Sequence, residues 1–225
     1  MNPSKLWASS LETVSKLYDR TIKGLSSGLR CRLCLASSGE ALCPGCRADL
    51  PWLPSTQRAL QRSYGLELAA FSYEFPISSL IVSAKYHAAR GTCRLLGDLL
   101  AASLAPPTEP VDCLVPVPMP WQRVLKRGYN QAEEVASVLA GAWNIPLRVD
   151  VLKRRGWQPP QRGASRRARK ANLKTAFVGE AELAGRAVLL VDDVTTTGAT
   201  LEACAEALQR AGASRVSAVV VARTA

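Results

Sequence analysis

Three short aliphatic runs in the second half of the chain constrain its fold more than any other feature. They cover residues 111–117, 186–191 and 216–221, and they lack the polar–apolar alternation of strands that face water on one side. Residues 132–139 and 201–211 repeat apolar side chains at steps of three and four, as one face of a helix does. Strands that are buried on both faces imply a parallel sheet covered by helices. We therefore expect an α/β fold with helices on both faces of the sheet.

The first half of the chain and the middle add further elements. An apolar stripe along residues 5–25 predicts an amphipathic N-terminal helix. The pattern predicts a strand over residues 66–73 and helices over 77–87 and 92–104. Residues 147–152 predict another strand, and a long basic loop follows it. These elements extend the same α/β plan toward the N-terminus.

Four of the seven cysteines form two CxxC pairs with eight residues between the pairs. Each CxxC turn directs two thiolates at one ion, and two such turns complete a tetrahedral site. Four thiolates leave no open coordination position, so the spacing favours one structural zinc ion per chain over a redox role. The expected zinc ligands are Cys31, Cys34, Cys43 and Cys46.

Residues 188–200, VLLVDDVTTTGAT, place two carboxylates and a turn of small residues between an aliphatic strand and a helix. Such a turn presents backbone N–H groups and a helix N-terminus to a ligand, which together suit a phosphate. The two carboxylates suit the diol of a sugar that carries this phosphate, and both reach one ribose only if the strand ends at about Asp192. The candidate binding residues are Asp192, Asp193, Thr195, Thr196, Thr197, Gly198, Ala199 and Thr200.

The charge of the chain predicts an anionic partner. There are 29 Lys and Arg residues against 18 Asp and Glu residues, which gives a net charge of +11. Residues 153–174 carry nine basic side chains and no acidic one, so this stretch is either a solvated loop or a surface for nucleic acid, phosphorylated metabolites or anionic lipid. The candidate DNA-binding residues within it are Arg162, Arg166, Arg167, Arg169 and Lys170.

Composition excludes two classes of protein. Hydrophobic residues make up 48% of the chain, which is too much for a mainly disordered chain. The longest aliphatic run, residues 187–191, is far shorter than the ~20 residues of a transmembrane helix. The N-terminal residues lack the pattern of a secretory signal, so we expect the cytoplasm.

Two segments resemble a known family. Residues 188–200 resemble the phosphoribosyl diphosphate (PRPP) motif of type I phosphoribosyltransferases. Residues 114–136, LVPVPMPWQRVLKRGYNQAEEVA, resemble the VPVP…RGxNQA signature of the ComF family, which couples a cysteine zinc module to a phosphoribosyltransferase-like domain and is linked to natural competence and DNA uptake. The resemblance implies that residues 153–176 form a loop over the binding site, which is called the hood loop in this family.

The resemblance also implies ligands and partners. It places the PRPP 5-phosphate on the threonine turn and the ribose diol on the acid pair. The diphosphate would lie beside Arg123, Lys126 and Arg127, with Mg²⁺ bridging diphosphate and ribose. Single-stranded DNA and other competence proteins are the implied macromolecular partners.

These observations predict three parts of the chain and leave its activity open. We expect an N-terminal helix in residues 1–28, a zinc module in 29–64 and a phosphoribosyltransferase-like domain in 65–225. Three functions fit: a phosphoribosyltransferase of nucleotide metabolism or salvage with an unknown acceptor, a PRPP-binding module that handles single-stranded DNA during uptake, and a structural adaptor. The adaptor leaves the acid pair and the threonine turn unexplained.

Overall fold

The computed structural model describes residues 29–54, 56–85, 89–155 and 175–224. The chain divides into two units between Asp49 and Leu50. The predicted N-terminal helix lies outside the described residues, as do residues 156–174 of the basic stretch and the DNA-binding candidates within them.

The first unit, described from residue 29 to residue 49, is a small loop-rich fold around the cysteines. An isolated bridge pairs Arg30 with Ser37, and helix α2 (Pro44–Ala48) follows the second half of the loop. Cys43 caps α2, because its Sγ accepts a hydrogen bond from the Cys46 backbone N–H at 3.5 Å. The backbone therefore turns around the cysteine side chains at both CxxC pairs.

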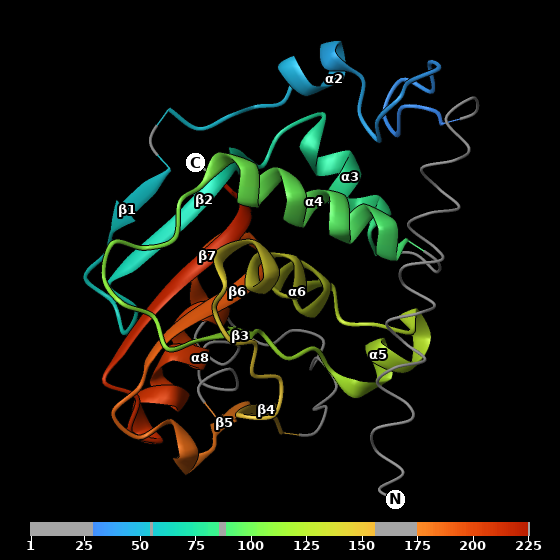
Figure 1. Ribbon diagram of the computed structural model, residues 1–225. Helices are drawn as coiled ribbons and strands as arrows, with labels where there is room; N and C mark the ends of the chain where they lie inside the picture. Colours follow the sequence, from blue (N-terminus) through green and yellow to red (C-terminus); the bar gives the residue numbers. More distant parts are fainter. Residues whose placement is uncertain (1–28, 55, 86–88, 156–174, 225) are drawn as a thin grey trace, which may run out of the picture. The chain divides into compact units, whose positions relative to one another are not determined.

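The second unit is built on a five-stranded sheet with the order β1-β2-β7-β6-β3 (Figure 1). Strands β2, β7, β6 and β3 are parallel, which confirms the expected parallel sheet, and β1 adds an antiparallel edge. The parallel strands all end at the same edge of the sheet. The strands are β1 (Gln57–Ala59), β2 (Leu66–Ser72), β3 (Cys113–Pro116), β6 (Ala187–Thr195) and β7 (Arg215–Arg223).

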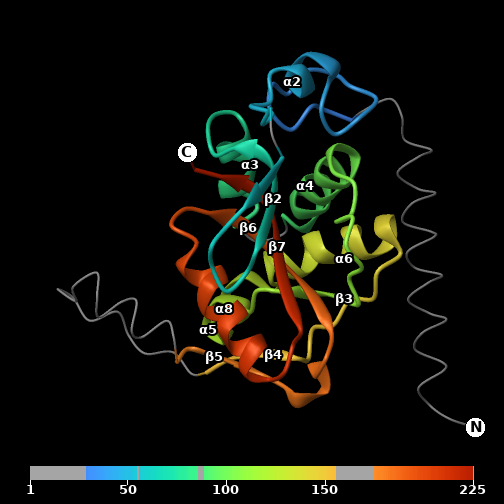
Figure 2. The ribbon, with the colours of Figure 1, turned by 90° about the vertical axis from the view of Figure 1, so that its left-hand side faces the viewer.

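Helices cover both faces of this sheet, as the sequence predicts. Figure 2 shows α4 (Arg90–Ser103) and α6 (Gln131–Trp143) on one side and α8 (Ala199–Arg210) on the other. Helix α3 (Ile77–Ser83) packs against α4. Among the described residues, no helix is long and apolar enough to cross a membrane.

The side chains of alternate strand residues form the core beneath α8. Val188 and Leu190 of β6 and Ala218 and Val220 of β7 belong to this buried cluster, together with Leu208 of α8. A strand alternates its side chains between two faces, so the residues between them face the α4 and α6 side. The unbroken aliphatic runs of the sequence follow from this burial on both faces.

A second, two-stranded sheet pairs β4 (Leu152–Arg154) with β5 (Phe177–Gly179) in antiparallel fashion, and the short 3-10 helix η1 (Ala181–Leu183) follows. The strand predicted over residues 147–152 is wrong in its extent. Leu147 makes one parallel bridge to Leu114 of β3, and the chain then bends before β4 begins. Hydrogen bonds between Arg148 and Asp150 lie at this bend.

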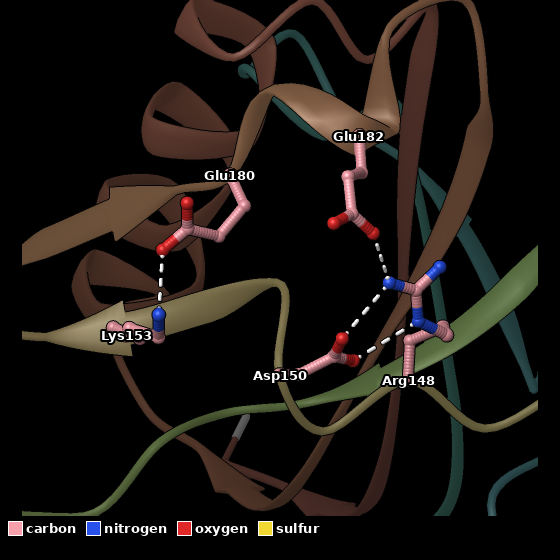
Figure 3. A network of polar contacts seen from close by, with 5 residues as sticks. All are labelled: Arg148, Asp150, Lys153, Glu180 and Glu182. Atoms are coloured by element: carbon pink, nitrogen blue, oxygen red, sulfur yellow. Dashed lines mark hydrogen bonds and ion pairs between the residues drawn. The ribbon is translucent and has the colours of Figure 1, made fainter.

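Arg148 and Asp150 pair across the bend, and the contact continues to the loop after β5 (Figure 3). Arg148 Nη2 also donates to Glu182 at 2.7 Å, and Lys153 Nζ donates to Glu180 at 2.8 Å. These hydrogen bonds raise the pKa values of Arg148 and Lys153 and lower the pKa of Asp150. The five side chains tie the two ends of the β4–β5 hairpin together.

The boundary between the two units differs from the one expected at residues 64 and 65. Residues 51–54 run beside β2, where Leu53 N donates to Ala70 O at 2.9 Å and Ser72 N donates to Pro51 O at 2.9 Å. Strand β1 then pairs directly with β2. Residues 50–64 therefore extend the sheet, and the smaller unit ends at Asp49.

Candidate functional site

A polar cleft of about 260 Å³ lies where β3 and β6 end. Ligands of open α/β sheets bind at this edge, beyond the carboxyl ends of the parallel strands. Helix α5 (Trp121–Arg127) follows β3 and supplies Arg123 and Arg127 to the cleft, whereas Lys126, the third basic candidate, does not line it. The charged side chains that line the cleft are Lys85, Arg123, Arg127, Arg154, Asp192 and Asp193.

Both acid-pair side chains line this cleft, although β6 continues through them to Thr195. Strand β6 therefore does not end at Asp192, which the sequence analysis had made the condition for both carboxylates to reach one ribose. Each carboxylate folds back on the next residue: Asp193 N donates to Asp192 Oδ1 at 2.9 Å, and Val194 N donates to Asp193 Oδ1 at 2.8 Å. Burial raises the pKa of Asp192 well above its usual value, and the charge of Asp193 raises it further.

Two of the cations in the cleft, Lys85 and Arg154, come from elements that the sequence did not connect to the acid pair. The Arg154 guanidinium lies 5.2 Å from the centre of the Phe177 ring, which holds its side chain at the hairpin. Burial lowers the pKa of Arg154, and the positive charge of Arg123 lowers it further. Like charges gathered in this way favour an anion between them.

The segment that joins α5 to α6 fixes the other side of the cleft. Gly128 ends α5 with φ of +81°, a conformation that glycine adopts without strain. Asn130 then caps α6 by accepting from Ala132 N at 3.2 Å, and its Nδ2 donates to Val117 O at 3.0 Å, just beyond β3. Asn130 therefore anchors the start of α6 to the end of the sheet.

Gln131 lines the cleft, and the Nε2 group of its side-chain amide has no hydrogen-bond partner among the described residues. The residue is only 4% exposed, and its Oε1 accepts a hydrogen bond from Arg127 Nη1 at 2.5 Å. A guanidinium only donates, so Oε1 faces Arg127 and Nε2 is turned away from it. Gln131 Nε2 is buried and has no hydrogen-bond partner in the described part of the chain, and such an unpaired donor costs about 1–3 kcal/mol in a protein. A ligand oxygen in the cleft would satisfy this donor, so the cleft fits an anionic, oxygen-rich ligand.

The threonine turn forms where the sequence predicts it, but the structure divides its residues between two hollows. Gly198 has φ of +73° and precedes α8, and Thr197 Oγ1 accepts from Ala199 N at 3.4 Å. Thr200 lines the cleft beside the acid pair. Thr195, Thr196, Thr197 and Gly198 line a second hollow, together with Arg58, Arg62 and Arg223.

The sequence analysis missed these three arginines. Arg58 and Arg62 lie in the segment that the sequence analysis assigned to the zinc module, residues 29–64, and Arg223 ends β7. Their charge was visible in the sequence, but their position was not. It depends on how the β1–β2 hairpin folds against the sheet and α8.

The four cysteines of the first unit lie together as expected. All four Sγ atoms are within 4.8 Å of one another, and the Cys34 and Cys43 sulfurs are 3.7 Å apart. A tetrahedral site with Zn–S bonds of about 2.3 Å places sulfurs about 3.8 Å apart. A hydrogen bond with Cys34 and burial raise the pKa of the Cys46 thiol to about 12, and the sulfurs of Cys43 and Cys31 add to this. The crowded sulfurs form a donor set that could bind a metal such as zinc.

The parallel sheet, the acid pair at its edge and the threonine turn define a phosphoribosyltransferase-type domain. Residues 124–225 match the family model of the phosphoribosyl transferase domain. Among solved structures, the glutamine phosphoribosylpyrophosphate amidotransferase from B. subtilis is 21% identical with a TM-score of 0.43, over 59% of this chain and 26% of that chain.

Two curated relatives identify the family. The DNA utilization protein YhgH of Escherichia coli (strain K12) is 30% identical over 209 residues, which are 86% of this chain and 90% of the relative. Competence protein F of Haemophilus influenzae is 37% identical over 115 residues, so the match spans half of each chain. The chain belongs to the ComF family.

Proposed function

We propose that this protein binds PRPP or a related ribose phosphate in the cleft at the end of β3 and β6. The observation that carries the proposal is the buried Nε2 group of Gln131, which has no hydrogen-bond partner among the described residues and lies in a cleft that also holds an acid pair and four cations. The acids suit hydroxyl groups, whereas the cations and the amide donor suit phosphate oxygens. A phosphorylated sugar offers both kinds of group in one molecule.

Within this proposal the residues divide by chemistry. Asp192 and Asp193 accept hydrogen bonds from the ribose diol, and the threonine turn holds the 5-phosphate. Arg123 and Arg127 bind the diphosphate, with Arg154 facing them across the cleft. Lys126 contributes only long-range positive charge. When bound, Mg²⁺ would neutralise diphosphate oxygens, because phosphates with few carboxylates are its usual setting.

We propose natural competence as the setting, with single-stranded DNA as a partner handled during uptake. Support comes from the names of the relatives, Competence protein F and DNA utilization protein YhgH. The basic stretch, residues 153–174, includes Arg154, which lines the cleft, so DNA bound at this residue would lie at the cleft. Its candidates Arg162, Arg166, Arg167, Arg169 and Lys170 lie outside the described residues.

An alternative is an active phosphoribosyltransferase. The cleft contains the groups needed to stabilise a diphosphate as it leaves C1 of the ribose, which is the main electrostatic demand of such a transfer. The nucleophile would come from an acceptor that the sequence does not identify. Incubation of PRPP with a panel of bases and amines tests this alternative: release of diphosphate that depends on one acceptor supports it.

We also propose one structural zinc ion per chain in the cysteine unit. Four sulfur ligands give the ion a closed coordination shell, and the small unit has few other buried side chains, Leu42 among them. Such units draw most of their folding free energy from the metal.

Thermal unfolding tests the ligand proposal at low cost. A ligand that binds only the native state stabilises it by RT ln(1 + [L]/Kd). We expect millimolar PRPP with Mg²⁺ to raise the Tm of the full chain, and an unchanged Tm would count against the cleft assignment.

A further inference from the structure

Helix α5 presents an apolar and basic face that takes no part in the cleft. No residue of α5 is buried, and Trp121 and Leu125 are 60% and 73% exposed. Side chains four residues apart on a helix are neighbours on one face, one turn apart. Large apolar side chains that stay exposed side by side are a feature of interaction sites. We propose that this outer face of α5, defined by Trp121, Leu125 and Lys126, binds single-stranded nucleic acid.

The outer face and the cleft lie on different sides of α5. Arg123 and Arg127, which are also four residues apart, line the cleft, whereas Trp121 and Leu125 do not. Successive helix residues are turned by about 100°, so Arg123 lies about 200° around the helix from Trp121. By the same count Lys126 lies between the apolar pair and the two arginines. One helix therefore offers cations to the cleft on one side and an apolar surface with a lysine on the other.

The charge around this face suits an anionic partner. Residues 113–132 contain three basic side chains and no acidic one. The ammonium group of Lys126 forms no hydrogen bond or ion pair with any residue that the structure describes, and it does not line the cleft. An ammonium group has three N–H donors, so Lys126 has its full capacity for a phosphate on the outer face.

Single-stranded nucleic acid matches both kinds of group on the outer face. Its bases are flat and unpaired, so one base can stack on the Trp121 indole beside Leu125 while a neighbouring phosphate meets Lys126. Aromatic side chains among basic ones are the usual means of binding single strands without sequence preference. A membrane surface fits less well, because α5 has only seven residues and surface helices bind membranes in proportion to the apolar area that they bury.

The inference rests on the proposed function in that it names where a single strand would dock. A strand on the outer face would lie beside the cleft, because Arg123 and Arg127 of the same helix line that cleft. The outer face shares no residue with the DNA-binding candidates of the basic stretch, residues 153–174. Variants can therefore separate the two surfaces from each other and from the cleft.

The test measures the binding of a labelled oligothymidylate to the full chain by fluorescence anisotropy at several salt concentrations. Trp121→Ala should raise the Kd about tenfold, because it removes one stacked base, and it should leave the slope of log K against log salt unchanged, because no phosphate contact is lost. Lys126→Ala should raise the Kd and also reduce the slope by about 0.7. Trp121→Phe keeps an aromatic ring and should bind nearly as the wild type does.

Phe75→Ala is the matched control. Phe75 is 79% exposed and follows β2, which β7 and β6 separate from β3 in the sheet. The variant removes an exposed aromatic ring from the same unit at a place away from α5, so its Kd should equal that of the wild type. Equal Kd values in the wild type and Trp121→Ala, or an equal rise in Phe75→Ala, would overturn the proposal. If Trp121→Ala lowers the Tm, the slope measured for Lys126→Ala decides instead.

Three further results separate this surface from the other proposals. Phosphatidylserine vesicles that bind the wild type but not Trp121→Ala, with an unchanged affinity for DNA, would assign the face to a membrane and overturn the inference. So would an affinity for DNA that falls only when the basic stretch is changed, with alanine at Arg166, Arg167, Arg169 and Lys170. If PRPP fails to raise the Tm of the wild type, the cleft proposal fails, while a loss of DNA affinity in Trp121→Ala still supports the outer face of α5.

Discussion

Arg127 and Gln131 are joined by a hydrogen bond of 2.5 Å that spans the junction between α5 and α6. The bond does two things at once. It holds the Arg127 guanidinium at the cleft, and it sets the orientation of the Gln131 amide so that the Nε2 donor has no acceptor among the residues that the structure describes. The RGYNQ segment of the sequence thus builds one wall of the cleft.

Substitution of Gln131 by Glu tests this wall. Gln131→Glu keeps an oxygen for Arg127 and replaces the partnerless donor by an acceptor that repels phosphate oxygens. We expect the Tm to fall little and the affinity for PRPP to fall about tenfold or more. Thermal unfolding measures the Tm and calorimetric titration measures the affinity for PRPP, each against the wild type.

Gln131→Leu provides the contrast, because it removes the donor without adding a charge. It should weaken PRPP binding less than Gln131→Glu does. Unchanged affinity in both variants would show that the amide of Gln131 takes no part in ligand binding.

Asp192→Asn should stabilise the protein at neutral and alkaline pH. Burial and Asp193 raise the folded-state pKa of Asp192, so its favourable contribution is complete below the unfolded pKa and is lost as pH rises through the folded pKa. Asparagine keeps the Oδ1 acceptor for Asp193 N and never ionises. We expect a gain of about 1 kcal/mol or more in unfolding free energy at pH 8, since one pKa unit corresponds to about 1.4 kcal/mol.

Denaturant unfolding at a series of pH values checks this sign. The gain in unfolding free energy should shrink toward pH 4, where Asp192 of the wild type is neutral in the native state, as the asparagine of the variant is. A variant that is less stable than the wild type at pH 8 would mean that the cleft already compensates the charge of Asp192.

Zinc should be present at one ion per chain in protein purified without chelator. Cys43→Ser removes one of the four sulfurs and the cap of α2, so the small unit should lose its metal and unfold. The sheet unit should keep its own cooperative transition, because its core is separate. Elemental analysis of both proteins gives the result, and wild-type protein without zinc would refute it.

DNA binding should be weak, independent of sequence and strongly dependent on salt. The fourfold variant Arg166→Ala, Arg167→Ala, Arg169→Ala, Lys170→Ala should lower the affinity for single-stranded DNA. The slope of log K against log salt should also fall, by about 0.7 per lost phosphate contact. Zinc content serves as the folding control. A variant that loses PRPP protection but keeps its DNA affinity would assign the basic stretch to the cleft ligand instead.

Much of the fold could be predicted from the sequence because its signals are local. The aliphatic runs of β6 and β7 reflect burial on both faces, and the apolar repeat of residues 201–211 corresponds to α8. The cysteine spacing predicted the cluster for the same reason, since each CxxC turn is set by its own residues. The sequence analysis required β6 to end at about Asp192 for both acids to reach one ribose, whereas in the structure β6 continues to Thr195 and both acids line the cleft.

The remaining site residues depend on tertiary contacts that no local pattern records. Lys85 and Arg154 join the acid pair only because α3 and the β4–β5 hairpin end beside the same cleft. Arg62 reaches the threonine turn from more than a hundred residues earlier in the chain. The unpaired Nε2 group of Gln131 can be recognised only in the structure, where the hydrogen bond from Arg127 to Oε1 fixes the orientation of the amide. Charge and residue type pointed to phosphate, but the structure was needed to place these groups.

The central claim is that the cleft binds PRPP, and calorimetric titration of PRPP with Mg²⁺ tests it most directly. The wild type should bind one PRPP per chain, and the double variant Asp192→Asn, Asp193→Asn should lose that binding while remaining folded. Arg186→Ala, which changes an arginine away from the cleft, should bind as the wild type does. Saturable binding in the wild type that disappears in the double variant is the predicted result, and absence of binding in the wild type, or equal binding in the double variant, would contradict the account.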